Sequence, residues 1–528
     1  MLGTHLAPLR GWDQGQRLTP GSRPGLHSAA APRLRMQRPT NSHFPCLSTC
    51  KIFSTMTRRD LLESAFLAAW PVIAFARESR NLAFTLAQFL NQTRFDSLPP
   101  HAIEHAKMIL ASTLASAAPG SLIDSARIVR DLAKERGGKP EATLWFDGTK
   151  LPMNEAARVN AMLSDAAASD DSDLRNVAHT GTTLTAAGLA IGERTGATGQ
   201  DLLCAIVTGY EAAGRIGEAL SGDRQGFHAS VIVAFGGVVA AARLLKLTDE
   251  QMAHAIGLTA TTMGGLAIGT NSWAREYQAG NAALCAVNAA LAAGRGYTVN
   301  EDMLEAPRGF LSVFGGGKVD TEKLTRDFGK EWDIVTHMAI KLVPGAHAFH
   351  PAVEAAVNAA RQSGVPPEDV VRILVSGPQI RTIARGRPPR DLVEAIHSLH
   401  YFLASAVADK DFSWVHATPE KIHNPAVARL IGLIEADPSP PPVHYDWSWG
   451  GTVTIVTRSG ARYTSTVDAP KASGPRGIEW SDVEGKYRAL LPDSGLPAKR
   501  TEEILNLIHG FERVKNVSEL TRLLRPRL

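Results

Sequence analysis

The sequence predicts a mainly α protein, built from a large all-helical domain that is interrupted by a smaller α+β lid domain. Three observations favour this fold. Long stretches rich in alanine, glycine and valine carry few charges, aromatic residues make up only 6% of the chain, and strand-like patterns begin after about residue 340. Small side chains let helices approach closely, which favours a helical core over a β-sandwich. A chain of 528 residues is also longer than one core usually supports.

The helical domain is expected over residues 80–340. Pro100 suits the first turn of a helix, and Thr198 and Thr248 each precede an Asp or Gln by three residues, the spacing of a capping box. Apolar on most faces, the segments that follow are expected to be buried helices at Leu202–Leu220, Ser230–Leu245 and Gly280–Ala293. None reaches the roughly 20 apolar residues of a membrane span, so no membrane span is expected.

The α+β lid domain is expected over residues 341–470. Val371–Val375 has the pattern of a strand, and Val453–Thr457 and Arg462–Val467 alternate around a Ser-Gly turn as the strands of a hairpin do. The helical pattern returns in residues 471–528. We therefore expect the C-terminal helices to complete the first domain.

Residues 1–79 are expected to be a leader outside the folded part of the chain. Positions 1–59 hold nine Lys and Arg residues against one Asp, without any apolar period. This composition fits a mitochondrial transit peptide. Two arginines after Met56, followed by an apolar run to Ala76, fit a twin-arginine export signal equally well. A plain disordered leader on a cytoplasmic protein is the third reading, and the compartment stays open among the three.

Composition and motifs exclude several classes of function. The formal net charge of +4 does not indicate a nucleic-acid partner, because the chain without its leader is slightly acidic. Four scattered cysteines suit neither a disulfide framework nor an iron–sulfur cluster, and there is no HExxH, GxSxG or Walker motif. We therefore expect no metal and no cofactor.

Charged and histidine side chains interrupt the apolar sequence at several points. Taken singly, each has a plainer reading, because a histidine at a helix start is more often a cap or a satisfied core residue. The run from Asp170 to Asp173 could likewise be a solvated loop. Further candidates stand at Arg175, His179, His228, Arg275, Lys341, His347, His350, His397, His400 and Tyr401.

Together, these residues resemble the MmgE/PrpD family, which includes 2-methylcitrate dehydratase and cis-aconitate decarboxylase. The resemblance runs from about residue 80 to the C-terminus, in the same order and with similar spacing. Asp170-Asp171-Ser172 resembles the end of the family's Asp-Phe-Asp-Asp-Thr motif, and Gly226-Phe227-His228 resembles its Gly-Phe-His. Glu394 to Tyr401 is similar to the family's Glu-Ala-x-x-Ser-x-x-Tyr, and Lys341 matches the lysine that opens its lid.

The resemblance implies a homodimeric, metal-independent lyase acting on a citrate-like di- or tricarboxylate, most simply a hydro-lyase of the 2-methylcitrate dehydratase type. Dehydration needs a base beside a carboxylate and an acid at the leaving hydroxyl, and cationic groups to hold the carboxylates. The residues in matching positions are His179, His228, Lys341 and Tyr401 for catalysis, and Asp170, Ser172, Arg175 and Arg275 for substrate binding.

Three alternatives stay open. A cis-aconitate decarboxylase would need similar groups, and so would an epimerase of a carboxylated substrate. A family member that has lost activity and acts as a scaffold is the third. Ala168 stands where the family motif has its first Asp, and Arg275 stands where the family has a lysine. An alanine cannot hold a substrate, so these departures put the substrate in question.

Overall fold

A computed structural model describes residues 81–220, 224–378, 380 and 383–526 of the chain. The expected leader, residues 1–79, and any targeting signal in it lie outside the described residues. The mainly α class predicted from the sequence is confirmed. Within the described residues, strands form only two short pairs and one sheet of four strands, and helices make up most of the remaining structure.

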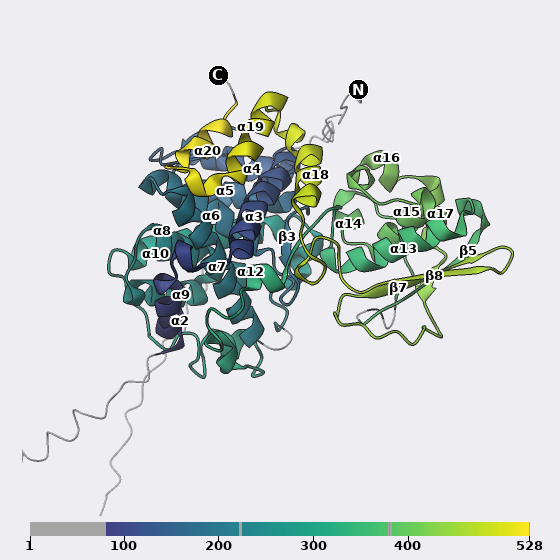
Figure 1. Ribbon diagram of the computed structural model, residues 1–528, viewed down its shortest axis with the longest axis horizontal. Coiled ribbons are helices and arrows are strands. Elements are labelled where there is room, and N and C mark those ends of the chain that lie inside the picture. The colour runs from purple at the N-terminus through teal and green to yellow at the C-terminus, as the bar shows by residue number, and fades with distance from the viewer. Residues whose placement is uncertain (1–80, 221–223, 379, 381–382, 527–528) are drawn as a thin grey trace, which may run out of the picture. The chain divides into compact units, whose positions relative to one another are not determined.

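The larger hydrophobic core lies among long helices rich in small residues (Figure 1). In α8 every residue except Arg243 is buried, and α6, α7 and α10 pack around it. A Cβ added to Gly209 of α7 would lie 2.7 Å from the carbonyl oxygen of Gly236 in α8, so these backbones are in direct contact. The helices are α2 (Leu82–Gln92), α3 (Pro100–Gly120), α4 (Asp124–Arg136), α5 (Met153–Ala166), α6 (Thr180–Thr195), α7 (Gly199–Ala219), α8 (Ser230–Leu244), α9 (Asp249–Thr262), α10 (Ala274–Ala293), α11 (Phe310–Phe314) and α12 (Asp333–Thr336).

The predicted helix starts are confirmed. Thr198 and Thr248 each accept a hydrogen bond from the backbone N–H three residues later, and Pro100 is the first residue of α3. The chain ends in three more helices, of which α18 lies beside α3 although nearly the whole described chain separates them (Figure 1). These are α18 (Trp480–Leu490), α19 (Ala498–His509) and α20 (Ser518–Leu523).

A second hydrophobic core lies within residues 341–470, which we call the sheet segment. Its four strands run in the order β6-β5-β7-β8, with β5 parallel to β6 and antiparallel to β7. The predicted strand and hairpin are confirmed, and α13 packs along β7 and β8 (Figure 1). The elements are β5 (Val370–Ser376), β6 (Ile434–Ala436), β7 (Gly451–Thr457), β8 (Arg462–Val467), α13 (His350–Ser363), α14 (Leu392–Ala395), α15 (Leu399–Asp409), α16 (Pro419–Ile422) and α17 (Pro425–Ile431).

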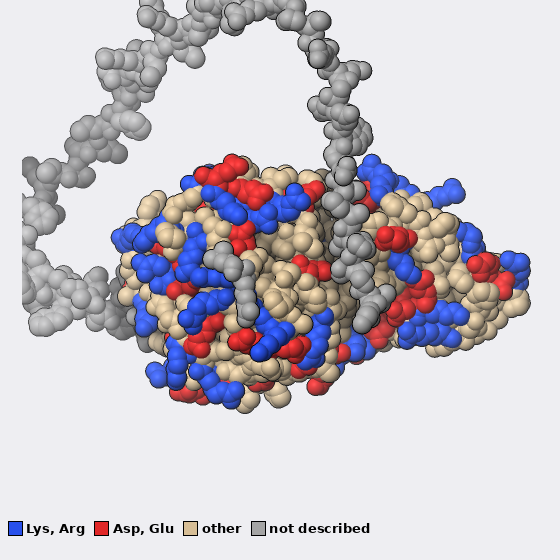
Figure 2. All heavy atoms as spheres, turned by 90° about the horizontal axis from the view of Figure 1, so that it is seen from above, with Lys and Arg blue, Asp and Glu red and all other residues tan. Residues whose placement is uncertain are grey.

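No single helix among the described residues has both the length and the apolar composition of a membrane span. Only α3 and α4 taken together pass that test, and they meet at a bend of 93°. Most of α3 is buried in the larger hydrophobic core. At the surface, Figure 2 shows Lys and Arg side chains interspersed with Asp and Glu across the face in view.

One short sheet brings together residues that are far apart in the sequence. β3 (Asp171–Asp173) pairs antiparallel with β4 (Met338–Ile340), while β1 (Ala142–Thr143) pairs with β2 (Lys150–Leu151) elsewhere. The β3–β4 register places Asp170 beside Lys341. The Lys341 backbone N–H donates to the Asp170 carbonyl oxygen at 3.2 Å, and Lys341 Nζ donates to Asp170 Oδ1 at 2.7 Å.

This ion pair is fully buried, with side-chain exposures of 2% for Lys341 and 0% for Asp170. Burial alone would raise the pKa of Asp170, but the neighbouring His179 and Lys341 outweigh burial and hold that pKa below its usual range. The carboxylate is therefore ionised at neutral pH. Removing one partner of such a pair is costly, because the other charge stays behind in an apolar interior.

Replacing Lys341 by methionine should therefore lower the free energy of unfolding by about 3–5 kcal/mol at pH 7. Adding Asp170→Asn removes the stranded charge, so the double variant should recover most of that loss. Urea unfolding of the three proteins measures both effects. As a matched control, Lys421→Met breaks the partly exposed pair with Asp409 and should cost no more than about 1 kcal/mol. Equal stabilities for Lys341→Met and the wild type would contradict the buried pair.

Candidate active site

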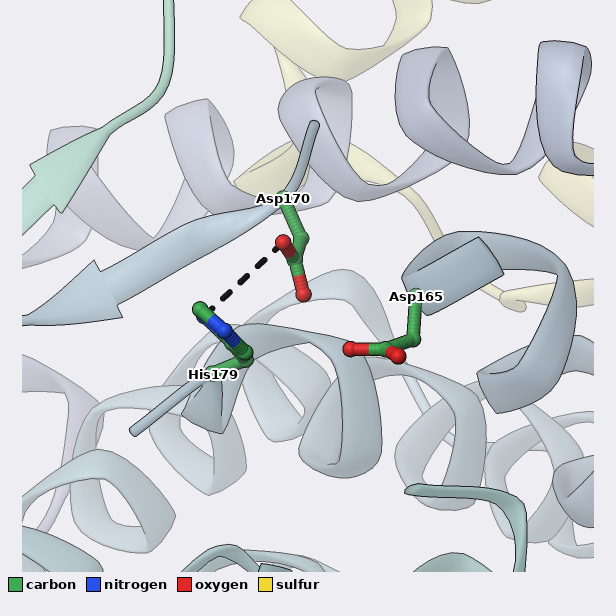
Figure 3. A group of neighbouring side chains, drawn as sticks. All are labelled: Asp165, Asp170 and His179. Carbon is green, nitrogen blue, oxygen red and sulfur yellow. Dashed lines mark ion pairs between the residues drawn. The ribbon is translucent and has the colours of Figure 1, made fainter. Parts of the chain in front are cut away.

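Three ionisable side chains, one of which is Asp170 of this ion pair, point toward one another (Figure 3). Asp165 comes from the last turn of α5, Asp170 from the loop before β3, and His179 from the N-cap of α6. His179 Nδ1 lies 3.8 Å from Asp170 Oδ1, and one atom from each of the three side chains falls within 4.8 Å of the others. Elements of the helical core thus direct the three groups to one point.

His179 presents an unprotonated ring nitrogen. Its Nδ1 lies 2.7 Å from the carbonyl oxygen of Asp171, which can only accept, so Nδ1 carries the proton. The Ser172 hydroxyl lies 3.3 Å from the same nitrogen. Nε2 has no hydrogen-bond partner among the described residues, and the side chain keeps 22% of its surface exposed. Burial lowers the pKa of His179 despite the nearby Asp170 carboxylate, so the ring is neutral at pH 7.

His228 has the opposite tautomer. Its Nδ1 accepts a hydrogen bond from the Ser230 backbone N–H at 3.2 Å, so in the neutral ring Nε2 carries the proton. Burial, together with the neighbouring His179 and Arg275, lowers the pKa of His228 to about 3. The two imidazoles are therefore both neutral at pH 7, one offering a lone pair and the other an N–H.

Arg275 is anchored at the end of α5 and is 5% exposed. Its Nη2 donates to the carbonyl oxygens of Asp165 and Ala166, at 2.8 and 3.0 Å, and its Nε lies 3.2 Å from Asp165 Oδ2. Burial raises the pKa of Asp165 although Arg275 opposes that shift. Nη1 of Arg275 makes no hydrogen bond within the described part of the chain, so one edge of the guanidinium is available to an anion.

Two further histidines lie in this electrostatic environment and were given no role from the sequence. His347 is 3% exposed, and neither of its ring nitrogens has a hydrogen-bond partner among the described residues. Burial, with His350 and Lys341, lowers the pKa of His347 well below its usual value. Burial and Arg275 lower the pKa of His397 to about 3. Both histidines were among the candidates named from the sequence, and His397 lies within the Glu394–Tyr401 segment that resembles the family.

Two of the predicted site residues, Tyr401 and Arg175, bond to other partners and lie outside this group. The Tyr401 hydroxyl donates to the carbonyl oxygen of His416 at 2.7 Å, inside the core of the sheet segment. Arg175 turns to the other side of β3, where it bonds Glu218 at 2.6 Å and pairs with Asp333. In both cases an acceptor from another element engages the side chain.

Two cavities are lined by predicted site residues that lie outside this group of three. A charged cavity of about 400 Å³ lies around Arg175, and its cations are already paired with neighbouring carboxylates such as Glu218. A smaller space of about 30 Å³ lies against Arg275 and Ala166, and residues of the sheet segment close its other side. Of the predicted site residues, only Arg275 lines that smaller space, which holds little more than one water molecule.

Asp165, Asp170 and His179 could in principle offer ligands to a metal ion. Their carboxylates are already engaged, however. Asp170 Oδ1 accepts from Lys341 and its Oδ2 from the Thr182 hydroxyl at 3.0 Å, while Asp165 pairs with Arg275. A divalent cation would have to compete with two fixed cationic side chains, so this donor set does not fit a metal centre well.

The chain is similar to proteins described as cis-aconitate decarboxylases. It is 22% identical over 460 residues to the one from Homo sapiens, covering 84% of this chain and 95% of the relative. With the one from Aspergillus terreus it shares 26% identity over 475 residues, covering 81% and 93%. With the one from Mus musculus it shares 22% identity over 463 residues, covering 84% and 94%.

Two family models match most of the part of the chain that the structure describes. The MmgE/PrpD N-terminal domain matches residues 85–322, which contain Asp170, His179 and His228. The MmgE/PrpD C-terminal domain matches residues 344–509, which take in the four-stranded sheet and α18. The resemblance seen in the sequence is thereby confirmed, and the chain belongs to the MmgE/PrpD family.

Proposed function

We propose that this protein is a metal-independent lyase acting on a citrate-like polycarboxylate, and that it catalyses a dehydration. The observation that carries the proposal is the pair of neutral imidazoles with opposite tautomers, beside buried cationic groups. His179 offers a lone pair at Nε2, whereas His228 offers an N–H. A base and a donor that are both uncharged at pH 7 suit proton abstraction next to a carboxylate.

The substrate's carboxylates would be held by Lys341, by the outer edge of Arg275 and by His347. Lys341 and Arg275 carry positive charge in a site with little water, where charge–charge attraction is stronger than in solution. A carboxylate oxygen would also give the buried His347 ring a partner, which it does not find among the described residues. The sheet segment contributes His347 and closes the small cavity, so we propose that this segment is an inserted lid that moves to admit substrate.

In the proposed dehydration, His179 Nε2 removes the proton from the carbon next to a carboxylate. The electrons of the broken C–H bond form the C=C bond, and the C–O bond to the leaving hydroxyl breaks. The protonated His179 then gives its proton to the departing hydroxide, which leaves as water. His228 stays neutral and donates a hydrogen bond to the charge that develops on an oxygen of the substrate.

Decarboxylation is the second candidate, because the relatives reported above are described as cis-aconitate decarboxylases. In that reaction the electrons of the broken C–C bond remain on carbon, and the carbanion takes a proton. His179 would then have to start protonated. Because burial lowers the pKa of His179, the resting site favours the dehydration. We propose a homodimer for either reaction, from the family resemblance alone.

Purified protein should convert 2-methylcitrate, citrate or cis-aconitate, and mass spectrometry of the products distinguishes loss of water from loss of carbon dioxide. His179→Gln should lower kcat by at least about 100-fold, because a glutamine cannot take the proton. His254→Gln is the matched control. His254 accepts a hydrogen bond from the Val299 backbone N–H and has no role in the proposed reaction, so this variant should keep wild-type activity.

The pH dependence gives the same assay a second readout. Dehydration needs His179 unprotonated, so kcat/KM should fall as the pH drops through the pKa of His179, below its usual value. Decarboxylation needs the protonated ring and would show the opposite slope. Conversion of none of the three acids, or full activity in His179→Gln, would overturn the proposed function.

Activity should also survive removal of metal ions. The carboxylates that could bind a cation already accept hydrogen bonds from Lys341 and Thr182 or pair with Arg275. Dialysis against EDTA, with the metal content checked by elemental analysis, should leave kcat unchanged. Turnover that is lost on dialysis and returns with added zinc or iron would show that a metal takes part.

A further inference from the structure

Lys486 is a buried lysine for which the proposed reaction has no use. It comes from α18, is 2% exposed, and donates from Nζ to the Ser112 hydroxyl of α3 at 2.7 Å. Its second acceptor is the carbonyl oxygen of Ser169. Ser169 directly precedes Asp170, so a lysine of the C-terminal helices is bonded to the backbone that carries the buried ion pair.

This backbone needs external support. Ala168 has φ of +48°, in the left-handed region that a non-glycine residue occupies at a cost of roughly 1–2 kcal/mol. Its carbonyl oxygen accepts from the Gly345 backbone N–H at 2.9 Å, and the Ser169 carbonyl oxygen also accepts from the Ser116 hydroxyl at 2.8 Å. Helix α3, helix α18 and the start of the sheet segment each supply a donor to these two carbonyls.

The charged groups that act on Lys486 are those of the site. Burial, together with the charge of Lys341, lowers its pKa to about 7 although the carboxylates of Asp170 and Asp171 oppose the shift. Asp171 is buried too, and burial with the charge of Asp170 raises its pKa to about 7. Lys486 is therefore electrostatically linked to the same ion pair that its hydrogen bond supports.

We propose that Lys486 is a positioning residue for the proposed lyase reaction, which fixes the Ser169 carbonyl and thereby the direction of the Asp170 side chain. Asp170 in turn holds Lys341 and lies beside His179. The inference rests on the proposed function and extends it, because it gives helix α18, which touches no substrate, a role in the site. A misplacement of about 1 Å at a reacting group can lower the rate about 100-fold.

Lys486→Met keeps the length and the apolar stem of the side chain and removes the donor. We expect kcat to fall about 10- to 100-fold while KM changes less than about threefold, since the groups that hold the carboxylates remain. Tyr487→Phe is the matched control. It removes the buried hydrogen bond from the Tyr487 hydroxyl to the Thr501 carbonyl oxygen, at the neighbouring position of α18, and leaves the bonds to the Ser169 carbonyl in place. Wild-type kcat in Lys486→Met would overturn the proposal.

Hydrogen exchange tests the positioning without any substrate. Amides of residues 165–173 should exchange faster in Lys486→Met than in the wild type and should be unchanged in Tyr487→Phe. Unchanged exchange there would overturn the role of Lys486, whether or not the three acids are turned over. If the wild type converts none of the acids but exchange does respond, the proposed function fails and the support of the loop stands.

Stability against pH gives an independent check on the buried ammonium. The folded-state pKa of Lys486 is lowered, so between pH 7 and about 10.4 the unfolded chain binds the extra proton. The wild type should therefore gain stability relative to Lys486→Met as the pH rises through that window. We expect the difference in Tm between the two proteins to shift steadily from pH 7 to 9.5. A constant difference would show that Lys486 is not held as inferred.

Discussion

The buried ion pair between Asp170 and Lys341 is the interaction on which the site depends. It forms because β3 and β4 pair, which brings residues 171 positions apart to within 2.7 Å of each other. Either charge alone would be unstable in this interior, so the two must meet in one geometry. The pair thus ties the loop after α5 to the point at which the sheet segment begins.

The burial of this site also determines the protonation state of the imidazoles. Burial lowers the pKa values of His179 and His228, and a backbone carbonyl or N–H at each Nδ1 then decides which ring nitrogen keeps its proton. The positive charge of the site therefore resides on lysine and arginine, while the histidines stay available for proton transfer. An anionic substrate with an acidic C–H bond is the chemistry that this division of roles suits best.

Much of the fold could be predicted because its signals are local. The capping threonines, the alternating hairpin and the apolar helices each depend on a few neighbouring residues, and the structure agrees with them. The site was harder. Tyr401 and Arg175 looked like site residues, but which acceptor each side chain meets depends on packing between distant elements. Lys486 gave no signal, because it lies among charged residues on an amphipathic helix and reads as a surface lysine.

A buried, cationic site keeps His179 and His228 neutral and in opposite tautomers. Nitrogen-15 NMR of the histidine side chains, assigned with His179→Gln and His228→Gln, tests this claim directly. At pH 7 we expect a protonated Nδ1 in His179 and a protonated Nε2 in His228, with no further protonation of the His228 ring as the pH falls to about 6. Finding either ring doubly protonated at pH 7, or both in the same tautomer, would contradict it.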